Sequence, residues 1–365
     1  MNYKETLFFI AKSLTISLEE KNRDEIEIIL KTTDVDWEAV VKLSTSHYVF
    51  SAMYCNFERA NFLKYLPADL VDYMKQITNI NRNRNTQILK QVQELNSLLL
   101  VNNITPIFLK GTGNLLAEIY YDIGERMVGD IDFIFSKDDY PKAITILRNN
   151  GYFNSTKDKY HFPEYKHYIR LKKENNIAAI EIHKNIVPEI YSNEFNYNFV
   201  KKDSQIINGF TVLSYANKLN LSIIADQIND MNFYFKKITL RNAYDVYLLS
   251  KKTKAKNAIS VLDKLNIPLN CFLSGCYELF NKIDTLEYHN SKKTASYLSV
   301  FNSQFINTKA TKNRHNFIRI YLFLKSRLYI LYKSVFDKNY RVWLFKRVTD
   351  KNWYKEKLNQ IRLKQ

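Results

Sequence analysis

The chain has 365 residues with 46 % hydrophobic side chains, which is enough for two modest domains or one elaborated domain. Only seven glycines and six prolines occur, which argues against a turn-rich barrel or sandwich and favours long helices with few strands. The net charge of +17 lies entirely in residues 251–365, where 24 Lys and Arg oppose 7 Asp and Glu, and such an asymmetry concerns partners rather than the fold.

Three cysteines, Cys55, Cys271 and Cys276, are poorly spaced for a zinc site and do not form a disulfide framework, so we expect reduced, buried thiols. The N-terminus lacks the pattern of a secretory signal peptide. The sequence contains no run of about 18 uncharged apolar residues, so no membrane-spanning helix is predicted. A cytoplasmic, soluble protein is therefore expected.

Helical spacing begins near Asp36 and continues in a long periodic stretch from Ala68 to about Asn102. A short β-like segment at 106–109 then leads directly into Lys110-Gly111-Thr112-Gly113, and a helix is expected at about 114–121. Further strands are predicted at 130–135, 167–172, 177–183 and 211–213, and a helix is predicted from 138 or 139 to Gly151. The pattern is helical from Ser214 onward. These elements predict an α+β fold, with a small mixed β-sheet core at 104–213 between helical regions at 1–103 and 214–365.

Two aspartates alternate with apolar residues in Gly129-Asp130-Ile131-Asp132-Phe133. Because side chains on a strand alternate between its two faces, Asp130 and Asp132 share one face, about 7 Å apart. Such a carboxylate pair suits Mg²⁺, which prefers oxygen ligands. Glu181, in the similarly alternating Ile180-Glu181-Ile182-His183, is the best candidate for a third metal ligand.

The segment Lys110-Gly111-Thr112-Gly113 between a strand and a helix has the form of a phosphate cradle, although it lacks the spacing of a Walker loop. Its glycines allow close backbone approach, and Thr112 adds a hydroxyl group. Arg126, shortly before the aspartates, could neutralise charge on a phosphoryl group. A turn of this kind or an Asp-x-Asp strand is usually structural on its own, and the combination of both with a later Glu-bearing strand favours catalysis.

These motifs resemble the polymerase beta-like nucleotidyltransferase superfamily, and more narrowly its bacterial "uncharacterised nucleotidyltransferase" family. The resemblance covers about residues 36–250 and is carried by Trp37, His47, Ile107-Phe108-Leu109-Lys110-Gly111, Arg126, Gly129-Asp130-Ile131-Asp132-Phe133, Gly151-Tyr152, Ile180-Glu181-Ile182-His183 and Leu240-Arg241-Asn242 with Asp245. The chain departs from the superfamily in having Gly111-Thr112 where Gly-Ser is usual. It also has a longer gap before Asp130, as though a loop that carries Arg126 were inserted.

The resemblance implies transfer of a nucleoside monophosphate from an NTP to a hydroxyl acceptor, with release of pyrophosphate. Asp130, Asp132 and Glu181 would bind one or two Mg²⁺ (or Mn²⁺) ions, and Glu181 could deprotonate the acceptor. Lys110, Gly111, Thr112 and Arg126 would contact the triphosphate. The acceptor could be a small molecule, a protein or RNA. Alternatives are an inactive binding module that retains the fold, and a toxin-like transferase that modifies RNA or protein.

Three histidines fall near the predicted site. His161 and His167 lie between two core strands, and His183 shares the face of Glu181, so each could contact substrate or have a purely structural role. His47, His289 and His315 are expected to be structural or surface residues.

The last segment, from Arg314, is dense in apolar residues interrupted by Arg319, Lys325, Arg327 and Lys333. We expect an amphipathic helix that packs on the catalytic domain with its basic groups in water. Binding to an anionic membrane surface, with a peripheral location, and binding to nucleic acid are the alternatives.

Overall fold

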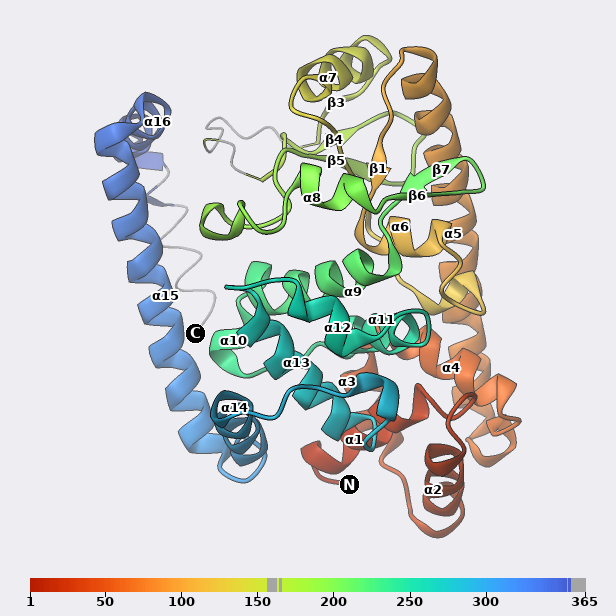
Figure 1. The fold of residues 1–365 in the computed structure, drawn as a ribbon. Coiled ribbons are helices and arrows are strands. Elements are labelled where there is room, and N and C mark those ends of the chain that lie inside the picture. Colours follow the sequence, from red (N-terminus) through yellow and green to blue (C-terminus); the bar gives the residue numbers. More distant parts are fainter. Residues whose placement is uncertain (156–162, 164–165, 353, 356–365) are drawn as a thin grey trace.

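The computed structural model describes residues 1–155, 163, 166–352 and 354–355. Within this part of the chain, a seven-stranded mixed sheet lies at one end of the molecule and helices make up the rest (Figure 1). The strands are β1 (Ile107–Phe108), β2 (Asp130–Ile134), β3 (Phe153–Asn154), β4 (Leu171–Lys172), β5 (Ala179–His183), β6 (Gln205–Ile207) and β7 (Phe210–Val212). The predicted α+β fold with a small mixed sheet is confirmed, and its division into regions at 103 and 213 stays a prediction.

The sheet has the order β3-β4-β5-β2-β1-β7-β6. At its centre, β2 runs parallel to β5 and antiparallel to β1, so the two strands predicted to carry acidic residues are direct neighbours. Their inward apolar side chains, Ile131, Phe133, Ile180 and Ile182, are completely buried. This burial fixes the register, because a shift by one residue would bring the apolar side chains to the opposite face.

The predicted and observed strands differ in two respects. The strand expected at 167–172 is reduced to β4 and an isolated bridge between His167 and His183. The turn after it contains Asn175, whose φ of 64° is left-handed, as in many hairpin turns. The short strands β3 and β6 were not predicted, since two or three residues carry too little alternation to recognise.

Five α-helices precede the first strand in sequence, and four further α-helices each come after a strand. The N-terminal helices are α1 (Tyr3–Ser13), α2 (Glu20–Thr32), α3 (Trp37–Ser46), α4 (Phe50–Arg59) and α5 (Ala68–Val101). Those interspersed with the strands are α6 (Lys110–Leu116), α7 (Asp139–Asn149) and α8 (Tyr197–Lys202), and α9 (Tyr215–Ile224) follows the last strand. Helix α5 begins directly after Pro67, as predicted, and runs the length of one side of the molecule (Figure 1).

The helices after α9 form the body beneath the sheet and a projecting tail (Figure 1). A π-helical turn (Ala225–Asn229) ends α9 and is followed by α10 (Asn232–Phe235), α11 (Leu240–Ser250), α12 (Ala255–Ser260), α13 (Asn266–Leu279), α14 (Lys292–Ser303), α15 (Thr308–Phe336) and α16 (Lys338–Val348). No helix in the described ranges is long and apolar enough to cross a membrane.

The tail formed by α15 and α16 differs from the prediction. Helix α16 folds back on α15 through Ile330, Tyr340 and Trp343. Most of the other apolar side chains of α15 are exposed instead of packed on the body. The expectation of an amphipathic helix that buries its apolar face against the catalytic domain is therefore wrong.

A lysine is buried in the helical layer below the sheet. Lys218 on α9 is 3 % exposed, and its Nζ donates a hydrogen bond to the carbonyl oxygen of Leu213. Burial lowers the pKa of Lys218 from 10.5 to about 7. The uncharged form is thus favoured in the folded state, so unfolding takes up a proton between about pH 7 and 10.5.

We expect Lys218→Met to raise the free energy of unfolding by about 1–2 kcal/mol at pH 7, because it removes a buried cation. The carbonyl oxygen of Leu213 keeps a donor, the Nε2 of Gln205 at 3.2 Å. The free energy of unfolding of the wild type increases as the pH rises from 7 to 10, so the difference between Lys218→Met and the wild type should shrink over this range. Urea unfolding at several pH values tests this, with Lys202→Met on the surface of α8 as a control. A difference that grows with pH contradicts the prediction.

Candidate active site

Two central strands bring the acidic residues together. In the parallel pairing of β2 with β5, Asp132 is the register partner of Glu181. Asp130 lies two residues before Asp132, and His183 lies two residues after Glu181, so all four side chains project from the same face of the sheet. The alternation in the two segments predicted the face, and the parallel pairing supplies the side-by-side placement.

Three of these side chains form a compact cluster. One carboxylate oxygen each from Asp132 and Glu181 and one ring nitrogen of His183 all lie within 4.8 Å of one another. The Nε2 of His183 donates to Oδ1 of Asp132 at 2.8 Å and lies 3.8 Å from Oε2 of Glu181. Two carboxylates and an imidazole at this spacing are a donor set that could hold a divalent metal ion. Sequence reasoning placed His183 near the site and did not count it among the ligands.

Lys110 supplies the positive charge beside this cluster. Its Nζ lies 2.5 Å from Oδ1 of Asp132 and 3.8 Å from Oε2 of Glu181. The backbone of Lys110 has a φ of 49°, which is left-handed and uncommon for a residue with a β-carbon. The strained conformation occurs where β1 passes into α6, next to a hydrogen bond from the amide of Leu109 to the carbonyl of Asp132. The junction between strand and helix therefore brings the ammonium group over the carboxylates.

The cluster is electrostatically coupled. Burial alone would raise the pKa of Asp132, but the charge of Lys110 and the hydrogen bond from His183 outweigh it and hold that pKa well below its usual range. Burial lowers the pKa of the His183 imidazole, although the carboxylate of Asp132 acts against this shift. At neutral pH the cluster therefore contains an ionised carboxylate next to an uncharged imidazole, and these are the forms in which both groups bind metal.

Asp130 lies on the same face as the cluster and is paired with a basic residue. Its carboxylate forms an ion pair with the guanidinium group of Arg170, which lies between the bridge residue His167 and β4. Within the described ranges, Asp130 is not a member of the three-residue cluster. Its role as a metal ligand stays a prediction, and Arg170 is a basic neighbour that sequence reasoning did not identify.

The predicted phosphate cradle is the first turn of α6 rather than a loop before a helix at 114–121. The Oγ1 of Thr112 donates to the carbonyl oxygen of Asp130 at 3.1 Å and ties α6 to β2. A β-carbon at Gly113 would lie 2.6 Å from the carbonyl oxygen of Phe108, and one at Gly111 would lie 3.1 Å from Val128. The glycines are thus explained by close packing, and contact of Gly111 and Thr112 with a nucleotide stays a prediction.

Arg126 is buried in an ion pair. Its Nε lies 3.1 Å from both carboxylate oxygens of Asp245 on α11, and its Nη1 donates to the carbonyl oxygen of Met127. Asp245 also accepts a hydrogen bond from Oη of Tyr120 at 2.8 Å. This ion pair fastens the segment before β2 to the helical body, and contact of Arg126 with a phosphoryl group stays a prediction.

The segment before β2 is further held by the polar side of α5. Asn81 donates to the carbonyl oxygen of Gly124 at 2.7 Å, and Asn85 donates to that of Arg126 at 2.7 Å. Arg82 forms an ion pair with Asp122 at 2.7 Å. The long gap between α6 and β2 is therefore an ordered connection, fixed by three side chains at helical spacing on α5.

Charged residues from other segments interact electrostatically with Lys110 and with one another. Burial raises the pKa of Asp230, and the positive charges of Arg241, Lys110 and Lys166 act against that shift, which places all four groups in one electrostatic neighbourhood. The Nζ of Lys166 donates to Oδ1 of Asn229 at the end of the π-helical turn, at 2.8 Å. Arg241 and Asp245 were part of the resemblance and had no predicted role, because their partners in space come from distant segments of the chain.

The other histidines considered from the sequence lie in different environments. His167 is exposed, with its ring 5.6 Å from that of His183, and contact with substrate stays a prediction. His161 lies outside the described residues. His47 accepts a hydrogen bond from the amide of Leu240 at 3.1 Å, and burial lowers its pKa to about 4, as expected for an uncharged structural histidine.

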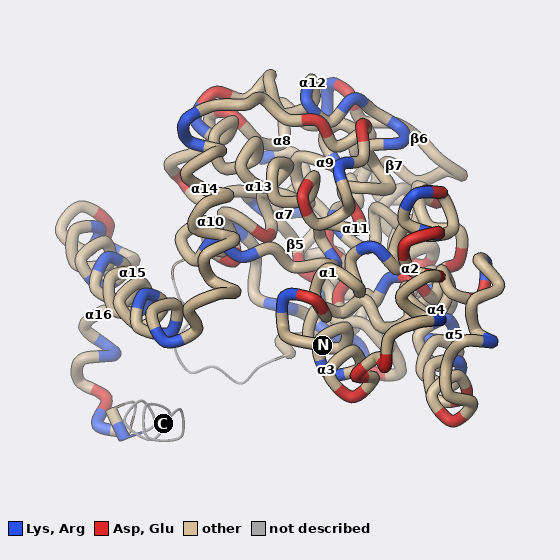
Figure 2. Tube along the Cα trace, turned by 90° about the horizontal axis from the view of Figure 1, so that it is seen from below, with Lys and Arg blue, Asp and Glu red and all other residues tan. Residues whose placement is uncertain are grey.

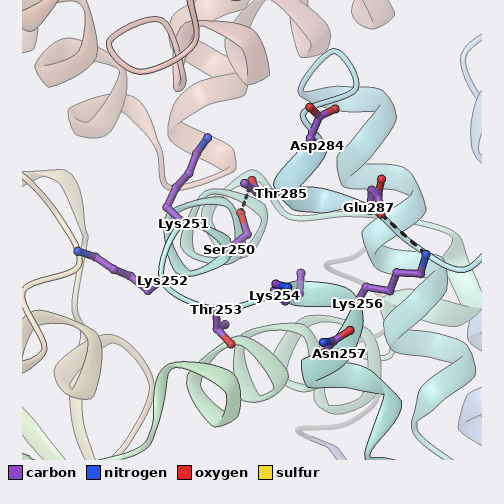
Figure 3. A pocket seen from close by; sticks show the side chains of 11 residues that line it. Ser250, Lys251, Lys252, Thr253, Lys254, Lys256, Asn257, Asp284, Thr285 and Glu287 are labelled. Atoms are coloured by element: carbon purple, nitrogen blue, oxygen red, sulfur yellow. Dashed lines mark hydrogen bonds and ion pairs between the residues drawn. The ribbon is translucent and has the colours of Figure 1, made fainter.

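A surface hollow of about 510 Å³ lies elsewhere, lined by residues 250–257 with Asp284, Thr285 and Glu287 (Figure 3). Its basic side chains do not converge: Lys252 points away from the other labelled residues, and Lys256 reaches towards Glu287. The hollow shares no residue with the cluster on β2 and β5, which remains the candidate site.

Comparisons with known proteins identify one matching family. The model of a family described as "Uncharacterised nucleotidyltransferase" matches residues 33–277. Helicobacter pylori JHP933, whose crystal structure is known, aligns over 63 % of this chain and 95 % of its own, at 13 % identity and a TM-score of 0.28. That likeness is too weak to carry an argument. No curated protein matches the chain.

Proposed function

The chain belongs to the uncharacterised nucleotidyltransferase family, and we propose that it transfers a nucleoside monophosphate from an NTP to a hydroxyl acceptor and releases pyrophosphate. The observation that supports this proposal most strongly is the cluster of Asp132, Glu181 and His183 with Lys110 beside it. The matched residues 33–277 include both strands of this cluster and α11 with Asp245.

The residues present fit a divalent cation. Asp132 and Glu181 provide two hard oxygen donors, and His183 provides a nitrogen, within 4.8 Å of one another. Asp130 offers a further carboxylate on the same face. We propose Mg²⁺ or Mn²⁺ as the cofactor, since both accept carboxylate ligands. When bound, such an ion would supply charge neutralisation at the phosphoryl oxygens.

The remaining roles follow from position and charge. An oxygen of Glu181, the most accessible of the clustered acids, would accept the proton of the acceptor hydroxyl as the new P–O bond forms and the bond to pyrophosphate breaks. Lys110 would exchange its contact with Asp132 for the triphosphate. Lys166 and Arg241 add positive charge near Asp230, which would otherwise repel the triphosphate.

Labelled nucleotides test the proposal. We would incubate the full chain with each α-labelled or γ-labelled NTP and Mg²⁺ or Mn²⁺, with cell extract as the source of acceptor. Nucleotide transfer places the α label on the acceptor, releases the γ label as pyrophosphate, and stops when EDTA removes the metal.

Other outcomes are equally informative. Transfer of the γ label would identify a kinase-like reaction and refute the proposal. Metal-dependent NTP binding without transfer of either label, across extracts from several sources, would favour a binding module that retains the fold. Label on RNA or protein, rather than on a small molecule, would assign the class of acceptor.

A further inference from the structure

Helix α15 carries an exposed apolar stripe. It consists of Phe317, Ile320, Leu324, Leu328, Leu331 and Val335, which recur every three or four residues and are each between 52 % and 71 % exposed. At 100° per residue these positions lie on one side of the helix. A continuous stripe of this length is more than the scattered single apolar residues of an ordinary protein surface.

The opposite side of α15 faces the body and makes polar contacts. Tyr329 and Lys333 bind Glu189, at 2.7 Å and 2.8 Å, in the segment that follows β5. Nearer its start, Arg314 donates to the carbonyl oxygen of Phe235 at 2.8 Å, and Lys325 donates to Oη of Tyr234 at 3.2 Å. The helix is therefore held with its apolar stripe turned away from the protein.

The two tail helices are also strongly basic. Residues 308–348 contain eleven Lys and Arg and a single acidic residue, Asp337. Figure 2 shows basic residues along α15 and α16 with little acid among them, whereas both signs are mixed over the body. Arg319 and Arg327 on α15 are both exposed. The stripe therefore lies on a pair of helices whose net charge is strongly positive.

We infer that α15 and α16 dock on the surface of an anionic phospholipid bilayer, with the apolar stripe inserted at the level of the head groups and the basic residues against lipid phosphates. An amphipathic helix that combines a long apolar side with Lys and Arg binds such surfaces through burial of its apolar side chains and through electrostatic attraction to anionic lipids. The charge of the tail complements an anionic membrane.

Two other occupants fit the stripe less well. A second copy of the chain would bring two tails of the same strong charge together, with Asp337 as the only acidic residue in each. Nucleic acid would satisfy the basic residues, but five of the six stripe residues are aliphatic, and Phe317 alone among the six offers an aromatic ring on which a base could stack. A lipid surface accounts for both features.

Vesicle binding by the full chain tests the inference. The probes are vesicles of phosphatidylcholine alone and vesicles with about 30 % phosphatidylserine, an anionic lipid. We expect binding to the anionic vesicles, at least tenfold weaker after Leu324→Ser, Leu328→Ser and Leu331→Ser are combined. A variant with Ile28→Ser, Val101→Ser and Ile206→Ser, three exposed apolar residues outside the tail, is the matched control and should bind like the wild type. Arg319→Gln with Arg327→Gln should also weaken binding, and more so at low salt.

Several results would overturn the inference. Equal binding to both kinds of vesicle would show that the negative charge of the lipid does not contribute to binding. Unchanged binding by the triple serine variant of the tail would show that the apolar stripe does not contribute. Tight binding of RNA or duplex DNA in place of vesicles would assign the tail to nucleic acid. A dimer in sedimentation that the same triple variant dissociates would assign the stripe to a second copy. Circular dichroism and thermal unfolding confirm that each variant is folded, and none of these readouts depends on nucleotide transfer.

Discussion

Asp132→Asn is expected to lower the rate of nucleotide transfer by at least about 1000-fold, the scale of losing a charge that acts on the transferring phosphoryl group. Asp132 is the residue through which the site is connected: it contacts Lys110 and His183, and it is the register partner of Glu181. Asparagine keeps the size of the side chain and removes the negative charge. The expected defect therefore lies in metal affinity and turnover, and Mn²⁺ titration with labelled-NTP transfer measures both.

The matched control is Asp138→Asn, which removes an exposed carboxylate just before α7 and should keep full activity. Glu181→Gln should reproduce the loss, because it removes the second clustered carboxylate. Thermal unfolding shows whether a variant is folded. Wild-type transfer by a folded Asp132→Asn protein would exclude the cluster as the catalytic centre.

The acidic part of the site could be predicted because it rests on local alternation. Asp130 and Asp132 alternate with Ile131 and Phe133, and Glu181 alternates with Ile180 and Ile182, so the face of each strand follows from its own few residues. The pairing of Asp132 with Glu181 needed the additional knowledge that β2 and β5 are neighbours. That knowledge came from the resemblance, since nothing in either strand specifies its partner.

The basic part of the site could not be predicted in the same way. Arg170 and Lys166 come from the segment before β4 and Arg241 comes from α11, so their interactions with Asp130 and Asp230 arise only when the chain folds. The left-handed conformation of Lys110 breaks a local rule, since residues with a β-carbon rarely adopt it and the sequence there suggested a flexible glycine turn. The prediction that the tail packs on the catalytic domain was wrong for a related reason. Amphipathic spacing shows that a helix has an apolar side, but it does not show what covers that side.

Two roles are considered for Arg126, contact with a phosphoryl group and the ion pair with Asp245, and they predict different effects when the side chain is removed. The sequence suggested that Arg126 neutralises a phosphoryl group, which implies that its removal raises the KM for NTP or lowers turnover and leaves stability unchanged. In the structure its side chain is 9 % exposed and that of Asp245 is 2 % exposed, and Nε of Arg126 lies 3.1 Å from both carboxylate oxygens. Removal of one partner of a buried pair leaves the other charge uncompensated, which is strongly destabilising.

We therefore expect Arg126→Ala to lower the free energy of unfolding by roughly 3–5 kcal/mol. Tyr120 still donates to Asp245, but an uncharged hydroxyl cannot replace the guanidinium group. Asp245→Ala should cost a similar amount, and the double variant should cost less than the sum of the two, because no charge is then left without its partner. Urea unfolding of the four proteins gives this cycle directly. If Arg126→Ala unfolds like the wild type while its KM for NTP rises, Arg126 serves the nucleotide and the pair with Asp245 is incidental; the expected coupling would instead show that Arg126 supports catalysis only by fixing the segment that leads into Asp130 and Asp132.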